Sequence, residues 1–158
     1  MDPDVKKKVL RQVTYGMYVV GSKAGDEVSA GTVNWLSQAS FSPPLIMLGV
    51  KTDSGLHEVV KKSDSFSVNV IAADQKQIAE DFFRPSKVEG NLVNGHAFAP
   101  GVTGAPILDE AYSYFECKVT GSIEQGDHSV FVGEVIEAEA RREDKPLEMW
   151  GTGWFYGG

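Results

Sequence analysis

The chain has 158 residues, of which 42% are hydrophobic and 23% are charged. These proportions are ordinary for a water-soluble globular protein, and the length corresponds to a single domain over residues 1–158 with a substantial core. The formal net charge is −7. Nucleic acids and anionic membranes select basic surfaces, so the charge argues against both as partners.

The chain has one cysteine, Cys117, and therefore no internal disulfide. The first ten residues have no apolar signal core, and the longest apolar run, around Leu45–Val50, is far shorter than the roughly 20 residues that span a bilayer. We therefore expect a cytoplasmic protein with no membrane segment. The three histidines are scattered and no C-x-x-C or H-E-x-x-H motif occurs, so we expect no metal site.

The hydrophobic periodicity predicts helices and strands in a definite order. They are a charged helix over 4–12, strands over 13–21, 27–35 and 45–51, a helix after residue 54, a strand over 66–71, a helix over 75–83, and strands over 112–123 and 130–141. Thr52, Asp53 and Ser54 are each able to cap the first internal helix, and Asp74 the second. Residues 124–127 are expected to join the last two strands as a hairpin, and residues 89–104 to form a long loop.

Two details refine this prediction. The strand over 45–51 is apolar enough to be buried on both faces, and in the strand over 112–123 Cys117 lies on the apolar face while Glu116 lies on the polar one. About six or seven strands with short connections favour a closed or half-closed antiparallel barrel over a doubly wound sheet. The predicted fold class is therefore mainly β.

The segment Lys51–His57 has the composition of an anion site. A helix N-terminus presents free backbone N–H groups and a partial positive charge, and hydroxyl and cationic side chains surround it here. An ordinary capped helix with a surface lysine explains the same residues, so the segment alone leaves both interpretations open.

The segment Asn34–Pro44, NWLSQASFSPP, mixes flat aromatic faces with amides and hydroxyls. A planar heteroaromatic ligand needs both kinds of group, and the isoalloxazine ring of a flavin fits. A polar strand end before a Pro-Pro turn is the alternative. No G-x-G-x-x-G or G-x-x-x-x-G-K-[ST] motif occurs, so a Rossmann fingerprint or a P-loop is excluded.

Several segments in order carry a resemblance to a known family. Residues 30–44, 51–54, 66–71, 115–119, 126–128 and 132–135 together resemble the flavin-reductase-like FMN-binding split-barrel family, close to flavoredoxin and to flavin-reductase domains fused to rubredoxin or flavodiiron proteins. The resemblance implies an antiparallel, Greek-key-like split β-barrel that works as a homodimer. It also implies FMN as cofactor, with FAD less favoured, and NADH or NADPH as electron donor.

The resemblance further implies that electrons pass to free flavin, rubredoxin or another acceptor. No C-x-x-C pair follows the aromatic segment 150–158, so a rubredoxin partner is expected to be a separate chain. A flavoredoxin-like electron carrier without its own NAD(P)H site is the main alternative function. A pyridoxamine-phosphate-oxidase-like barrel is a weaker one.

The resemblance also assigns roles to residues. The expected flavin contacts are Thr32, Asn34, Trp35, Leu36, Ser37, Gln38, Ala39 and Ser40. The expected phosphate contacts are Lys51, Thr52, Asp53, Ser54, His57 and Arg84. His128 is expected to contact the nicotinamide or the flavin ring, with an exposed hairpin donor as the alternative. The aromatic residues of 150–158 are expected to pack on the barrel, on a second subunit or over the flavin.

Overall fold

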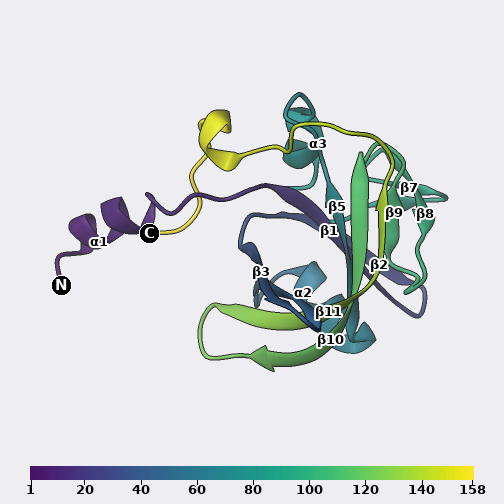
Figure 1. Cartoon of the computed structure of the whole chain (residues 1–158), viewed down its shortest axis with the longest axis horizontal. Coiled ribbons are helices and arrows are strands. Elements are labelled where there is room, and N and C mark those ends of the chain that lie inside the picture. The colour runs from purple at the N-terminus through teal and green to yellow at the C-terminus, as the bar shows by residue number, and fades with distance from the viewer.

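Two antiparallel sheets make up most of the structure (Figure 1). The larger has seven strands in the order β2-β1-β5-β10-β11-β4-β3, and the smaller has four in the order β6-β7-β8-β9. The computed structural model describes residues 1–158. The predicted mainly β, antiparallel class is therefore confirmed.

The strands of the larger sheet are β1 (Tyr18–Ala24), β2 (Glu27–Val33), β3 (Leu36–Phe41), β4 (Pro44–Lys51), β5 (Ser65–Val70), β10 (Ser113–Ile123) and β11 (His128–Ala140). Those of the smaller sheet are β6 (Val88–Glu89), β7 (Leu92–Val93), β8 (His96–Pro100) and β9 (Pro106–Leu108). The helices are α1 (Pro3–Leu10), α2 (Gly55–Ser63), α3 (Lys76–Asp81) and a 3₁₀ turn, η1 (Met149–Thr152). None of them combines the length and the apolar character needed to cross a bilayer.

Helix α2 fills the inside of the curved larger sheet. Leu56, Val59 and Val60 recur at helical spacing and are buried where the helix packs against β1, β2 and β5. Ser54 caps the helix, because its side chain accepts a hydrogen bond from the backbone N–H of His57 at 3.1 Å. The sheet is thus an open barrel with β2 and β3 as its two edges.

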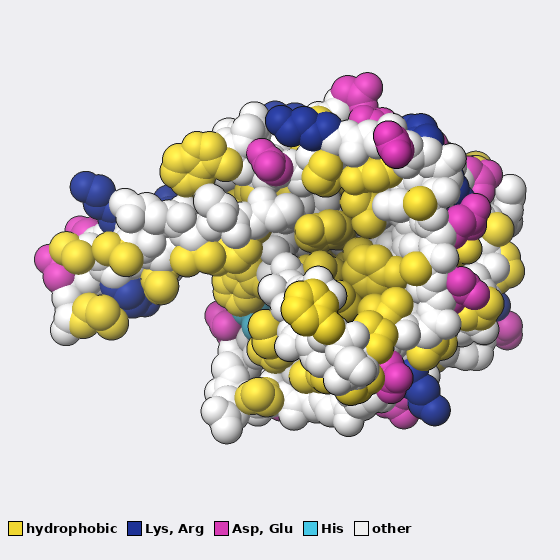
Figure 2. All heavy atoms as spheres, viewed as in Figure 1, with side chains coloured by type: hydrophobic (Ala, Val, Ile, Leu, Met, Phe, Trp, Pro, Cys, Tyr) yellow, Lys and Arg dark blue, Asp and Glu magenta, His cyan; other side chains and the backbone are white.

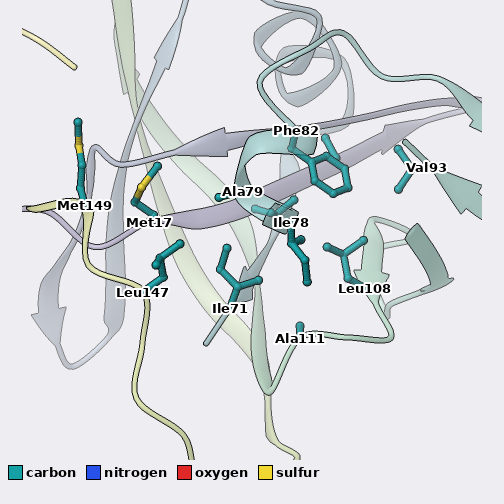
Figure 3. Packing of buried hydrophobic residues seen from close by; sticks show 12 residues of the cluster. Met17, Ile71, Ile78, Ala79, Phe82, Val93, Leu108, Ala111, Leu147 and Met149 are labelled. Atoms are coloured by element: carbon teal, nitrogen blue, oxygen red, sulfur yellow. The ribbon is translucent and has the colours of Figure 1, made fainter. Parts of the chain in front are cut away.

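An apolar cluster that is separate from the α2 packing holds the C-terminal segment against the barrel (Figure 3). Met17 of the segment before β1, Ile71 after β5 and Leu147 pack together there. The backbone N–H of Leu147 donates to the carbonyl of Ile71 at 3.0 Å, and that of Met149 donates to Tyr15 at 3.0 Å. These contacts hold the start of η1 beside the barrel, so the last residues of the chain lie next to α1 (Figure 1).

Several predictions about elements are wrong. Residues 89–104 are not one loop, because β7 and β8 form there and β6 ends there. Strand β4 alternates between exposed and buried positions instead of being buried on both faces. Asp74 does not cap α3, which starts after Gln75 without a side-chain cap.

Glu116 corrects the prediction for β10. It was expected on the polar face, yet its side chain is fully buried. Its carboxylate accepts hydrogen bonds from the backbone N–H groups of Val102 and Thr103, each at 2.9 Å, and from the Thr103 hydroxyl. The loop before β9 therefore satisfies a charge that would otherwise be costly to bury. Cys117 lies in the core as predicted, where burial raises the pKa of its thiol to about 12.

Candidate functional site

A cavity of about 850 Å³ lies between the edge strand β2, the end of β4 and the start of α2. Its volume is within the range of sites that hold drug-sized ligands. Segments far apart in the sequence complete it, since residues 82–86 and 153–156 also line it. Its lining combines charged and hydroxyl side chains with aromatic ones.

The N-terminus of α2 forms part of the cavity lining. Ser54, Gly55 and Leu56 line it together with Lys51 at the end of β4. The Ser54 hydroxyl donates to the carbonyl of Lys51 at 2.8 Å, which joins the strand end to the helix start. A helix of this kind attracts an anion through its free N–H groups and its dipole.

The charges around the cavity favour an anion. Arg11, Lys51 and Arg84 line it as cations, and Asp53 is the one carboxylate among the lining residues. The Lys51 ammonium lies 3.0 Å from Asp53, and this hydrogen bond raises the pKa of Lys51. The whole chain has a net charge of −7, so a net positive cavity is a local departure from an acidic protein.

Strand β2 forms one wall of the cavity. The Thr32 hydroxyl donates to the carbonyl of Ala79 at 2.6 Å, and its backbone N–H donates to Phe82 at 3.2 Å. Asn34 is 6% exposed, and its side-chain amide nitrogen lies 3.1 Å from the sulfur of Met149. The side-chain Oδ1 of Asn34 and the lone pairs of the Thr32 hydroxyl therefore remain available to a ligand's donors.

Aromatic side chains line the cavity beside Lys51, which pairs with His128 between β4 and β11. His128 and Tyr156 both line it, and His128 Nε2 lies 2.8 Å from the Tyr156 hydroxyl. His128 Nδ1 lies 2.9 Å from Asp127 Oδ1, and this hydrogen bond lowers the pKa of Asp127. The ring centroids of Trp35 and His128 are 4.3 Å apart. Such a surface offers flat contacts and one imidazole at the edge of the cavity.

The structure brings seven of the predicted site residues to the cavity. They are Thr32, Asn34, Lys51, Asp53, Ser54, Arg84 and His128. Their convergence places four of the six expected phosphate contacts, two of the eight expected flavin contacts and His128 on one surface.

The structure does not bring Leu36–Ser40 to the cavity. These residues form β3, which pairs only with β4, and Ser37, Gln38 and Ala39 are exposed. The chain turns away at Trp35, whose carbonyl accepts a hydrogen bond from Gly49 N–H at 2.7 Å. Trp35 itself contacts His128 but is not among the residues that line the cavity.

Thr52 and His57 also lie outside the cavity lining. The Thr52 hydroxyl donates to the carbonyl of Asp127 at 3.1 Å and so holds the β10–β11 turn. The His57 ring is buried 2.8 Å from the Ser129 hydroxyl, and burial lowers its pKa. The His57 ring therefore lies in the core against Ser129 and not on the cavity lining.

Many of the lining residues were not singled out from the sequence. They include Arg11, residues 29–31, and residues 82, 83, 85 and 86 on either side of the predicted Arg84. Ser86 shows why local patterns missed them, because its hydroxyl pairs with the backbone N–H and carbonyl of Ala30, 56 residues away. The density of aromatic residues in 150–158 was the one signal that pointed toward the cavity.

Comparison with known proteins gives consistent matches. The family model described as "Flavin reductase like domain" matches residues 10–157. The NADH-dependent FAD reductase of Streptomyces globisporus is 30% identical over 146 residues, which cover 85% of this chain and 78% of that protein. Putative diflavin flavoprotein A 3 of Nostoc sp. is 31% identical over 139 residues, 84% of this chain but 24% of that protein. The chain thus spans about a quarter of the length of the diflavin flavoproteins that it matches.

Further matches extend the comparison. The high molecular weight rubredoxin of Moorella thermoacetica is 26% identical over 142 residues, covering 89% of this chain and 62% of that protein. The solved structure of the Streptomyces globisporus NADH:FAD oxidoreductase SgcE6 superimposes with a TM-score of 0.83 at 28% identity, covering 100% of this chain and 95% of that one. BorF, the flavin reductase component of a bacterial two-component tryptophan halogenase, gives 0.79 at 32% identity, covering 94% and 93%.

Proposed function

Because the chain belongs to the flavin reductase like domain family, which matches residues 10–157, we propose that it binds a flavin in the cavity and reduces it with a nicotinamide nucleotide. The observation that carries this proposal is that cationic groups, a helix N-terminus and aromatic side chains line one cavity. Lys51, Arg84 and the start of α2 suit a phosphate, and Phe82, Trp154 and Tyr156 suit a flat ring. A flavin nucleotide has both a phosphate and a flat ring.

We propose FMN as the flavin, with FAD as the less favoured alternative. One helix N-terminus with Lys51 and Arg84 beside it suits a single terminal phosphate. The Streptomyces globisporus relative is named for NADH and FAD. Its name supports a nicotinamide donor and is the reason that FAD is retained as the alternative flavin. The donor is NADH or NADPH.

The residues of the cavity fit this ligand. A bound flavin would supply a ring that accepts hydride from reduced nicotinamide. Lys51 and Ser54 would bind the phosphate of the flavin, and Thr32 and Asn34 would form hydrogen bonds with the polar edge of its ring. The apolar lining residues would exclude water. Hydride transfer requires two rings held in contact rather than a protein base, so positioning is the main contribution of the protein.

The electron acceptor is proposed from the relatives. The match to a high molecular weight rubredoxin supports passage of electrons to a rubredoxin-like protein, and free flavin is the other proposed acceptor. Both acceptors require that electrons leave the bound or released flavin after its reduction. Stoichiometric reduction of added rubredoxin would therefore separate the two.

We also propose that the chain works as a homodimer. Helix α1 has no buried residue, and Val5, Val9 and Leu10 are exposed on it. Figure 2 shows hydrophobic side chains along the segment that projects from the body. Exposed apolar surface of this kind supports burial against another protein surface.

Anaerobic mixing of the FMN-loaded protein with NADH, and separately with NADPH, tests the proposed reaction. We expect one of the two nucleotides to bleach the visible flavin absorption at a catalytic rate. Binding of FMN without bleaching by either nucleotide would favour the electron carrier without its own nicotinamide site. Failure to bind any flavin would refute both functions.

A further inference from the structure

We infer that the basic side of α1, together with the exposed aromatic residues beside it, is the docking surface for an acidic electron-transfer protein. The inference rests on the proposed function, because the partner would receive its electrons from the flavin. Docking there would place the partner beside the flavin cavity.

Residues 1–12 are the basic part of an acidic chain. They contain two carboxylates and four cations, the cations being Lys6, Lys7, Lys8 and Arg11. Their net charge is therefore +2, whereas the remaining 146 residues carry −9. Figure 2 shows Lys and Arg side chains on the segment that projects from the body. Such a charge distribution orients an acidic protein toward α1, since the rest of the surface repels it.

Three cations of α1 have no carboxylate partner. Lys7, Lys8 and Arg11 line a surface hollow of about 380 Å³, in which Asp4 is the one acidic residue. None of the three cations forms an ion pair. Lys61 of α2, by contrast, lies 2.7 Å from a carboxylate. The unpaired cations therefore remain available to carboxylates of another protein.

Aromatic side chains complete this surface. Trp150 and Phe155 line the same hollow and are 65% and 61% exposed. The Arg11 guanidinium lies 5.5 Å from the centre of the Phe155 ring, and Arg11 Nε donates to the carbonyl of Gly157 at 3.2 Å. Aromatic residues and Arg are enriched in protein–protein interfaces relative to the rest of the surface. Redox partners form small, transient interfaces, so a surface of this size suits one of them.

The docking surface is continuous with the flavin cavity. Arg11 and Phe155 line both the hollow and the cavity. A protein seated on the hollow would therefore lie beside the proposed flavin, as electron transfer requires. Two partner molecules, each reduced by one electron, would reoxidise one flavin that has received a hydride, and one proton would pass to water.

The apolar residues of α1 lie on a different side of the helix. With 3.6 residues per turn, Lys7, Lys8 and Arg11 share one side, and Val5 and Val9 share another. Contact between two copies through Val5 and Val9 would leave the basic side accessible. The proposed homodimer and the docking of a redox partner are therefore compatible.

A double charge reversal tests the docking surface. Lys7→Glu/Lys8→Glu replaces two unpaired cations and changes no residue of the cavity lining. The probe is an acidic rubredoxin mixed with the photoreduced, FMN-loaded protein. Its reduction should be slower than with the matched control by roughly tenfold at an ionic strength of about 10 mM, because electrostatic steering raises association rates about 10- to 1,000-fold. The difference should vanish at about 1 M salt, where the Debye length is about 3 Å.

The matched control is Lys118→Glu/Lys145→Glu. Both lysines are exposed and lie outside the hollow and the cavity lining, and the control has the same net charge as the test variant. Lys7→Arg/Lys8→Arg retains the charge and should reduce rubredoxin at the rate of the wild type. Reduction of the bound flavin by the nicotinamide nucleotide should be equal in all four proteins.

Two further measurements test the chemistry of the partner. Titration of ¹⁵N-labelled rubredoxin with the flavin-free protein should shift NMR signals of its acidic surface, and Lys7→Glu/Lys8→Glu should abolish the shifts. This readout needs neither flavin nor turnover. Rubredoxin whose carboxylates have been converted to amides should be reduced at equal rates by the test variant and the control, because it has lost the charge that α1 attracts.

The outcomes separate this inference from the proposed function. Equal reduction of acidic rubredoxin by the test variant and the control at low ionic strength would overturn the docking surface and leave flavin binding intact. Slower flavin reduction by the nucleotide in the test variant, with equal rubredoxin rates, would overturn it as well and assign the cations to the nucleotide. Absence of flavin binding with the predicted NMR shifts would refute the proposed function alone.

Discussion

The Ser54 hydroxyl donates to the Lys51 carbonyl at 2.8 Å and accepts from the backbone N–H of His57 at 3.1 Å. One side chain therefore caps α2 and fixes the end of β4 against it. Because Lys51 and the start of α2 both line the cavity, this relationship sets the geometry of the proposed phosphate contacts.

Ser54 allows the cap and the phosphate site to be separated. Ser54→Ala should lower the free energy of unfolding by about 1 kcal/mol, because the helix loses its cap. Ser54→Asp retains a capping side chain and should leave stability nearly unchanged, yet its carboxylate should repel the phosphate and weaken FMN. Urea unfolding and FMN titration measure the two effects. Equal FMN affinity in wild type and Ser54→Asp would argue against a phosphate at the start of α2.

Lys51 should contribute to phosphate binding but not to ring binding. Lys51→Ala should weaken FMN by roughly tenfold, because the phosphate loses a charge-assisted hydrogen bond. Riboflavin, which lacks the phosphate, should bind both proteins equally. Lys61→Ala is the matched control, since Lys61 is an exposed lysine on α2 paired with Glu124 and outside the cavity lining. Equal losses for FMN and riboflavin would contradict the assignment.

Glu116 should matter for stability rather than for binding. Glu116→Gln replaces one acceptor oxygen with an NH₂ group that faces backbone donors of the loop at Val102 and Thr103. We expect the free energy of unfolding to fall by about 2–3 kcal/mol, the range for hydrogen bonds to a charged group. The exposed Glu137→Gln serves as control and should change stability by less than about 0.5 kcal/mol. Comparable urea midpoints for the two variants would contradict the role of Glu116.

His96 should give the protein a pH-dependent stability. Burial lowers the pKa of His96, but hydrogen bonds to Glu110 and Asp81 outweigh burial and raise it above 6.5. A raised pKa means that the contribution to stability is complete below pH 6.5 and disappears as the pH rises through the higher folded value.

The Asp81 carboxylate limits the contribution of this interaction to stability at low pH. The hydrogen bond from His96 lowers the pKa of Asp81 below 3.8, so its contribution is present above pH 3.8 and is lost as the pH falls through the folded value. His96→Gln should therefore remove the decline in unfolding free energy above pH 6.5, as measured by urea unfolding across that range. An identical decline in wild type and variant would assign the pH dependence to other groups.

Local sequence signals predicted the elements that depend on local contacts. The β10–β11 hairpin and the capped helix α2 follow from alternation, helical spacing and Ser54, and the structure has both. Strand β3 was not predicted, because its polar sequence pairs only with β4 at an edge and buries little. Likewise β7 and β8 are too short to show a periodicity.

The candidate site likewise contains residues that local sequence signals indicate and residues that only distant contacts place there. Lys51 and Ser54 were found because a strand end and a helix start are adjacent in sequence. The place of Ser86 was not found, because it depends on a contact with the distant Ala30. The family resemblance assigned Leu36–Ser40 to the flavin, and the structure places them on β3, paired with β4 and outside the cavity lining.

Equilibrium titration of the purified protein with FMN, followed by the change in flavin fluorescence, tests the central claim most directly. The account predicts saturable binding of one FMN per chain, weaker binding of riboflavin, and loss of the difference between them in Lys51→Ala. Absence of saturable binding, or FMN binding that Ser54→Asp and Lys51→Ala leave unchanged, would contradict the assignment of this cavity as the flavin site.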